Sequence, residues 1–100
     1  MLKHIVLWKL KEDTSRPGGF QTAINMKRKL ESMRGEISAI NSLEVQLDIG
    51  RKNNYDICLI AAFANEQALD EYINHPLHKE VSDFINTIRE SRVAIDFWVI

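Results

Sequence analysis

Apolar residues alternate with polar ones, or run without a break, over four short segments of the chain. Residues 3–10, 55–63 and 92–100 carry apolar side chains at both odd and even positions, whereas residues 43–49 carry them at odd positions only. A period of two indicates a β-strand, and a strand that is apolar on both faces must be covered on both faces. The pattern therefore predicts three strands covered on both sides and one strand, at 43–49, with a face in water.

Three other segments repeat apolar residues at spacings of three and four, as amphipathic helices do. Lys27 is the one polar residue on the first stripe, which otherwise consists of Phe20, Ala23, Leu30, Met33 and Ile37. The second stripe follows Asn65, a favourable N-cap residue. Proline fits the first turn of a helix and pushes the residue before it out of helical geometry. The second helix is therefore predicted to end near Asn74, and the third to begin at Pro76.

The predicted order of elements is that of a ferredoxin-like β-α-β-β-α-α-β subunit, an α+β fold. One hundred residues make a single domain, residues 1–100. Because the helices of this fold cover only one face of an antiparallel sheet, the other apolar face needs a further layer. A second copy is the simplest cover, and we expect a homodimer through the sheet face whose two sheets form an α+β barrel.

Composition excludes several classes of partner. Thirteen basic and fourteen acidic residues leave a net charge of −1, so no overall field favours nucleic acid or an anionic membrane. The basic run at residues 27–29 lacks the interleaved aromatic side chains of a nucleic-acid site, and no segment approaches the roughly 20 apolar residues of a membrane span. The single cysteine, Cys58, favours a reducing, cytoplasmic location. Within a strand apolar on both sides, it is expected to be an inert core thiol.

Candidate chemistry gathers around Pro76. Tyr72 lies on the apolar stripe before the proline, and His78 flanks the stripe after it, so both are expected to face the gap between helices and sheet. A histidine in the first turn of a helix feels the positive end of the dipole, which keeps the imidazole neutral and able to act as a general base. His75 lies at the joint itself, where it either caps the following helix or contacts a ligand.

His4 is expected to lie near Asp96 or Trp98 across the sheet, because the first and last strands are antiparallel neighbours in this fold. The carboxylate would orient the imidazole, either as a structural contact or as part of the same site. His75 and His78 have a spacing of three, which can hold one metal ion, but no acidic third ligand lies on the same helical face. We therefore expect neither a metal nor a cofactor.

Four short stretches carry a resemblance to a known family: residues 3–10, 55–57, 72–78 and 95–97. Together they resemble the stress-responsive dimeric α/β-barrel (Dabb) domain over essentially the whole chain. The resemblance implies a ferredoxin-like subunit and a barrel-shaped homodimer. Many members of that family have no known activity, and some plant members are stress-associated proteins.

At least one plant member of that family is a polyketide cyclase, which catalyses an intramolecular aldol condensation with a tyrosine and a histidine. Those positions match Tyr72 and His78, and His4 and Asp96 match polar positions that line the cavity there. Ile57 stands where that cyclase has a further cavity histidine, so the likeness to its active site is incomplete.

Two functions from different classes follow. The first is a stress-associated or small-hydrophobic-ligand-binding barrel without catalysis, in which His4, Asp96 and His75 contact the ligand. The alternative is a cofactor-independent enzyme, an aldol cyclase or lyase or, by fold analogy, an oxygenase, acting on a polyketide-like or aromatic molecule. There His78 removes a proton next to a carbonyl and Tyr72 holds the oxygen. A pocket of roughly 300 Å³ or more would favour binding or catalysis, and a filled space a purely structural role.

Overall fold

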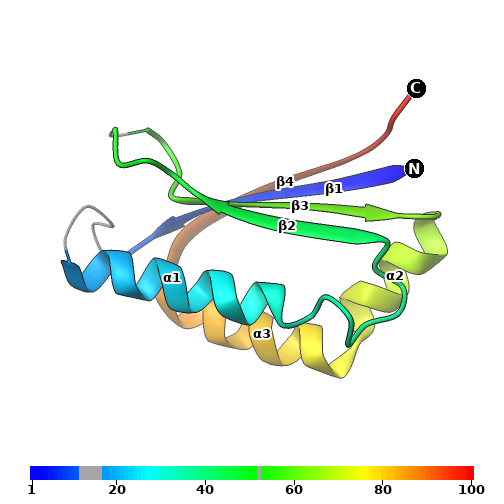
Figure 1. Ribbon diagram of the computed structural model, residues 1–100, viewed down its shortest axis with the longest axis horizontal. Helices are drawn as coiled ribbons and strands as arrows, with labels where there is room; N and C mark the ends of the chain where they lie inside the picture. The colour runs from blue at the N-terminus through cyan, green and yellow to red at the C-terminus, as the bar shows by residue number, and fades with distance from the viewer. Residues whose placement is uncertain (12–16, 52) are drawn as a thin grey trace.

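The computed structural model describes residues 1–11, 17–51 and 53–100 of the chain. Their elements are strand β1 (Leu2–Leu10), helix α1 (Pro17–Glu31), strands β2 (Ser42–Leu47) and β3 (Ile57–Phe63), helices α2 (Glu66–Asn74) and α3 (Pro76–Ile88), and strand β4 (Arg89–Trp98). The sheet has the order β2-β3-β1-β4, with every neighbouring pair antiparallel. Figure 1 shows the helices on one side of this sheet. The predicted ferredoxin-like α+β fold is confirmed.

The joint between α2 and α3 forms as predicted. The Asn65 side chain accepts a hydrogen bond from the Ala68 amide at 2.9 Å and so caps the start of α2. Helix α2 ends at Asn74, and α3 begins at Pro76. Between them His75 has an extended backbone, with φ −67° and ψ 138°, as a residue before proline should have.

Helix α1 ends sooner than its apolar stripe predicted. The stripe was expected to reach Ile37, but the helix ends at Glu31 and a series of turns follows. Gly35 has φ 89°, a left-handed conformation that glycine adopts without steric cost and that breaks a helix. Met33 and Ile37 are nevertheless buried, so their spacing reflects core packing rather than a helix. At the other end of the stripe Phe20 is 48% exposed, and its predicted place in the core is wrong.

The strands begin and end within a few residues of the predicted positions. The strand predicted over 55–63 begins at Ile57, the one predicted over 43–49 spans Ser42–Leu47, and the last strand spans Arg89–Trp98 instead of residues 92–100. No helix in the described ranges has the length and apolar character needed to cross a membrane.

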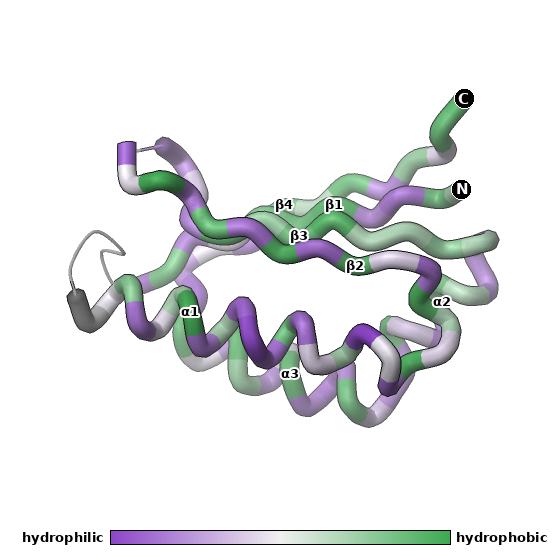
Figure 2. Tube along the Cα trace, viewed as in Figure 1, coloured by the Kyte–Doolittle hydropathy of each residue, from purple (hydrophilic) through white to green (hydrophobic). Residues whose placement is uncertain are grey.

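The two faces of the sheet differ in what covers them. On the helix side the strand residues are buried, among them Val6, Val45 and Leu59. Among the described residues, no layer covers the opposite, outer face, and Figure 2 shows apolar stretches along β1, β3 and β4 but alternating polar positions on β2. This outer face carries the half-buried Ile5, Leu7, Cys58 and Ile60 and the exposed Val93, Ile95 and Phe97.

Cys58 is half-buried on the outer face of β3. The sequence had suggested a place in the core of the subunit, and that prediction is wrong. The prediction failed because the alternation of β3 assigns the even-numbered residues to the side without helices. Partial burial, and to a smaller extent the charge of Glu44, raises the pKa of its thiol. The protonated thiol is a poor nucleophile.

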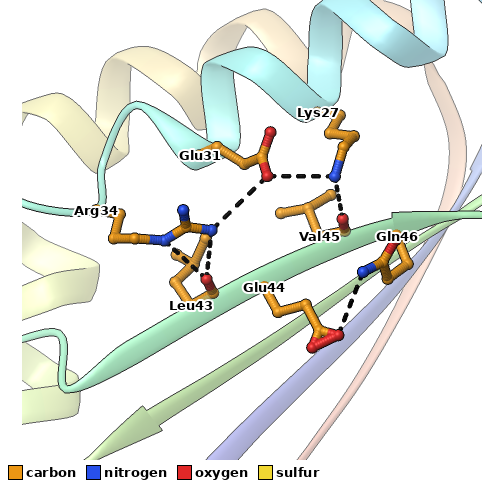
Figure 3. Close-up of polar contacts among 7 residues, drawn as sticks. All are labelled: Lys27, Glu31, Arg34, Leu43, Glu44, Val45 and Gln46. Carbon is orange, nitrogen blue, oxygen red and sulfur yellow. Dashed lines mark hydrogen bonds and ion pairs between the residues drawn. The ribbon is translucent and has the colours of Figure 1, made fainter.

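Lys27, the polar residue on the α1 stripe, caps the edge of the sheet (Figure 3). Its Nζ donates to the Val45 carbonyl at 2.5 Å and to the Glu31 carboxylate at 3.2 Å. Arg34 donates in the same way from Nε and Nη2 to the Leu43 carbonyl, at 2.9 and 2.6 Å. Both carbonyls lie on the free edge of β2, because hydrogen-bonded pairs between β2 and β3 fall at the even-numbered β2 residues. The two cations thus satisfy an edge that no strand pairs.

Candidate functional site in a cavity beneath strand β1

Strands β1 and β4 bring His4 and Asp96 together. The two residues are partners in the register of the strands, and His4 Nδ1 donates a hydrogen bond to Asp96 Oδ1. The contact predicted from the fold is confirmed. His4 is 5% exposed, whereas the Asp96 side chain is 46% exposed. The imidazole is thus held in a fixed orientation inside the fold by a carboxylate that remains in contact with solvent.

Tyr72 lies between the two histidines that the sequence singled out. Its ring centroid is 6.0 Å from that of His4 and 4.6 Å from that of His78, with interplanar angles of 68° and 65°. These are edge-to-face arrangements, which aromatic rings favour. Phe63 packs on the remaining side of Tyr72, with ring centroids 5.1 Å apart. Helices α2 and α3 and strand β1 therefore converge on one cluster of rings.

Three of these rings line one end of a cavity of about 100 Å³ between the sheet and the helices. We call His4, Tyr72 and His78 the histidine end, and Trp8, Asn86 and Arg92 the arginine end. The two ends are ordered by the fold, because β1 runs from His4 to Trp8 while α3 runs from His78 to Asn86. The wall between them is mostly apolar and consists of Val6, Leu30, Met33, Val81, Ser82 and Ile85. The prediction that Tyr72 and His78 face the gap between helices and sheet is confirmed.

Burial sets the protonation of the two central side chains. Loss of water around His78, and then the nearby charge of His4, lowers the pKa of the imidazole below its ordinary 6.5. The predicted direction is confirmed, although burial rather than the helix dipole is the main cause. Burial also raises the pKa of Tyr72 to about 12, against a smaller opposite effect of Arg92. At neutral pH the site therefore holds an uncharged imidazole beside a protonated phenol.

His75 does not belong to this cavity. Its Nδ1 accepts a hydrogen bond from the Leu77 amide at 3.0 Å and so caps the start of α3. It is not among the residues that line the cavity. Of the two roles open to this residue, the structure places it in the helix-capping one. Among the residues that the structure describes, no group of three or more histidine, cysteine, aspartate or glutamate side chains could hold a metal ion.

The sequence model of one protein family matches residues 2–99, and its description is the stress-responsive A/B barrel domain (Dabb). The chain belongs to this family. A search of curated proteins finds no match. The Dabb assignment therefore rests on the whole chain, in agreement with the resemblance noted from its motifs.

Solved structures similar to this Dabb chain include two dimeric ferredoxin-like proteins of unknown function. The one from Bacteroides fragilis is 29% identical, with a TM-score of 0.86, and the match covers 98% of this chain and 95% of that chain. The one from Thermobifida fusca is 25% identical, with a TM-score of 0.78 and coverages of 98% and 90%. A Dabb protein from Mesorhizobium loti, 23% identical, shares the fold with a TM-score of 0.75 and coverages of 99% and 96%.

The arginine end of the cavity of this Dabb chain was not predicted from the sequence. The alternation predicts Arg92 as the first residue of the last strand and places Trp8 in the first strand, without a role for either in a site. A signal was available, because the even-numbered residues of β4, which include Asp96, lie on the same face of the sheet as His4. Extending that parity from Asp96 back along the strand leads to Arg92, which is the register partner of Trp8.

Proposed function

We propose that this Dabb protein is a cytoplasmic homodimer that binds a small, largely apolar molecule in the cavity beneath β1. The observation that carries the proposal is the composition of the cavity wall, where apolar core side chains lie next to the polar rings of Tyr72 and His78. Such a mixture of apolar surface and a few convergent polar groups is typical of small-molecule sites. The cytoplasmic location rests on the single free cysteine.

The size of the cavity limits the ligand. At about 100 Å³ it is smaller than the ~300–1,000 Å³ of sites for drug-sized molecules. It does not reach the roughly 300 Å³ that would favour binding or catalysis on size alone, but it is also not filled by side chains. The ligand is therefore a single ring or a short chain, and a bulky polyketide of the kind considered from the sequence is disfavoured.

A titration with a neutral ring compound tests the binding proposal. We expect benzyl alcohol to cause saturable amide shifts in ¹H–¹⁵N NMR spectra at Val6, Val81 and Ile85. Val81→Phe, which fills the cavity, should abolish these shifts, and Ser82→Leu is a milder second variant. The control Ile73→Phe enlarges an exposed side chain on α2 and should leave them unchanged. Shifts confined to residues outside the cavity would contradict the proposal.

Proton transfer is a second candidate function, favoured by the uncharged His78 lying 4.6 Å, centroid to centroid, from the phenol of Tyr72. In this reaction His78 takes the proton from a carbon next to a carbonyl, and the electron pair moves onto the carbonyl oxygen, where the Tyr72 hydroxyl donates to it. No cofactor takes part. An oxygenase activity has only the fold in its favour and is not proposed.

Hydrogen–deuterium exchange measures this reaction directly. Incubation of acetone with the protein in D₂O should replace methyl protons by deuterium faster than in buffer, and NMR follows the loss of signal. His78→Gln should abolish the acceleration, and Tyr72→Phe should reduce it while leaving the ring packing intact. An acceleration unchanged in both variants would exclude these residues from the reaction.

The outer face of the sheet is the proposed dimer interface. Ile5 lies between Ile60 on β3 and Ile95 on β4 in the register of the strands, and these residues form an apolar row across three strands. Exposed apolar patches of this kind commonly mark sites of protein association. The dimeric state of the Bacteroides fragilis and Thermobifida fusca proteins supports a second copy of this chain as the partner.

A further inference from the structure

The arginine end of the cavity has no part in the chemistry proposed above. Arg92 and Trp8 are register partners on β4 and β1, and Asn86 comes from the last turn of α3. Arg92 is an exposed residue of the edge strand β4, and its place in the cavity lining puts a positive charge at this end. The donors and acceptors at this end therefore indicate what the cavity can hold.

All three of these side chains present hydrogen-bond donors. In the described part of the chain, no carboxylate lies within ion-pair distance of the Arg92 guanidinium. Trp8 is 5% exposed, and its Nε1 is buried without a hydrogen-bond partner among the described residues. The Oδ1 of Asn86 already accepts from Arg89 Nε at 2.9 Å, which leaves Nδ2, a donor, as its other polar atom. A buried donor without an acceptor costs stability, so this end favours a ligand that supplies acceptors.

We propose that the arginine end holds a carboxylate group of the ligand, so that the bound molecule is a small apolar carboxylic acid. The inference rests on the proposed binding function and names its ligand class. The planar fork of a guanidinium matches a carboxylate with two parallel N–H···O bonds. Its charge remains at any physiological pH, because arginine does not lose its proton in proteins.

The same arrangement fixes the direction in which the ligand lies. Asp96 is four residues from Arg92 along β4, about 13 Å at the rise of a strand, and its carboxylate stands at the histidine end with His4. An acid group at that end would meet a like charge, whereas at Arg92 it meets an opposite one. The apolar part of the ligand then lies along Val6 and Ile85, and its far end points toward His78.

The charge of Arg92 reaches the histidine end, which provides a second readout. It contributes to lowering the pKa of His78 and opposes the rise in the pKa of Tyr72. A carboxylate that neutralises Arg92 therefore raises the pKa of His78. A neutral ligand of the same size lacks this effect.

Titrations with benzoate and with benzyl alcohol, a neutral compound of similar size, test the inference. We expect benzoate to bind at least about tenfold more tightly, because charge-assisted hydrogen bonds are the strong ones. The indole N–H signal of Trp8 should shift downfield with benzoate, and Trp98→Phe distinguishes it from the only other tryptophan. Arg92→Gln should remove the preference for benzoate. Arg28→Gln, which changes the net charge equally on the exposed face of α1, should keep it.

Two results would overturn the carboxylate site and leave the binding function standing. One is equal affinity for the two compounds in the wild-type protein. The other is a benzoate preference that survives Arg92→Gln, which would place the anion elsewhere. If neither compound shifts a resonance of the cavity residues, the proposed binding function fails and the carboxylate site fails with it.

Discussion

His4 Nδ1 donates to Asp96 Oδ1, so the first and last strands of the chain are joined inside the candidate site by one hydrogen bond. The sheet order makes this possible, because β1 lies in the interior of the sheet and β4 lies beside it at the edge. The same imidazole packs against Tyr72. An acid on the edge strand therefore orients a buried ring, which in turn contacts the centre of the proposed site.

Removal of the Asp96 acceptor should cost a modest amount of stability. We expect Asp96→Ala to lower the free energy of unfolding by about 1 kcal/mol, the usual net value of one such bond, because the half-exposed site lets water replace the carboxylate. Asp96→Asn keeps an acceptor oxygen and should cost less. Urea unfolding monitored by fluorescence measures both. A larger loss in Asp96→Asn than in Asp96→Ala would contradict a simple acceptor role.

His75 should affect the stability of α3 and leave the cavity unchanged. Because its ring accepts the Leu77 amide hydrogen, His75→Ala should cost about 1 kcal/mol, as the loss of an N-cap does. His75→Asn, which can cap in the same way, is the matched control and should restore most of that stability. Unfolding in urea gives the first comparison, and benzyl alcohol titration the second. A loss of affinity in both variants, with the fold intact, would show that His75 contacts the ligand after all.

Periodicity of the sequence was sufficient for the histidine end of the site. Helical spacing placed Tyr72 and His78 toward the sheet, and the strand order placed His4 opposite Asp96. Periodicity failed after the end of α1, where Met33 and Ile37 keep helical spacing inside a series of turns. The Ile37 amide donates to the Met33 carbonyl at 3.1 Å, so an isolated turn of helical geometry imitates the pattern of a longer helix.

The volume of the cavity and its arginine end could not be predicted in the same way. A cavity is the space left between the packed side chains of β1, α1 and α3. The spacing of apolar residues along one element does not determine the size of that space. The unpartnered indole N–H of Trp8 is likewise a property of the packed structure. From the sequence, a tryptophan in an apolar strand indicates only a large buried side chain.

The stability of the protein should depend on pH through His78. Its pKa in the folded state lies below its ordinary value of 6.5, so at pH values between the two the unfolded chain binds a proton that the folded chain does not. Protons therefore favour unfolding in this range, and stability should fall as the pH is lowered through 6.5.

The variant His78→Gln should show a shallower loss of stability over the same range. Urea unfolding at a series of pH values gives the slopes, and the Cε1 proton of His78 reports its titration in NMR spectra. Identical slopes for the variant and the wild-type protein would mean that another group controls the effect.

Assembly should depend on the outer face of the sheet. Ile95 is 59% exposed at the β4 end of the apolar row, and Ile95→Lys places a charge there that a covered interface cannot solvate. We expect this variant to be monomeric and the wild-type protein to be dimeric in size-exclusion chromatography with light scattering. Ile73→Lys, the same change at a 40% exposed position on α2, should remain dimeric. A dimer that survives Ile95→Lys would place the interface elsewhere.

Lys27 and Arg34, the two cations on the edge of β2, affect how readily a strand of another molecule can add to the sheet. Open strand edges are where chains add to one another in fibrils. A strand that approaches β2 must displace Lys27 from the Val45 carbonyl and Arg34 from the Leu43 carbonyl, so each cation loses a hydrogen bond to the edge. The two cations therefore protect the free edge of β2 from the addition of a further strand.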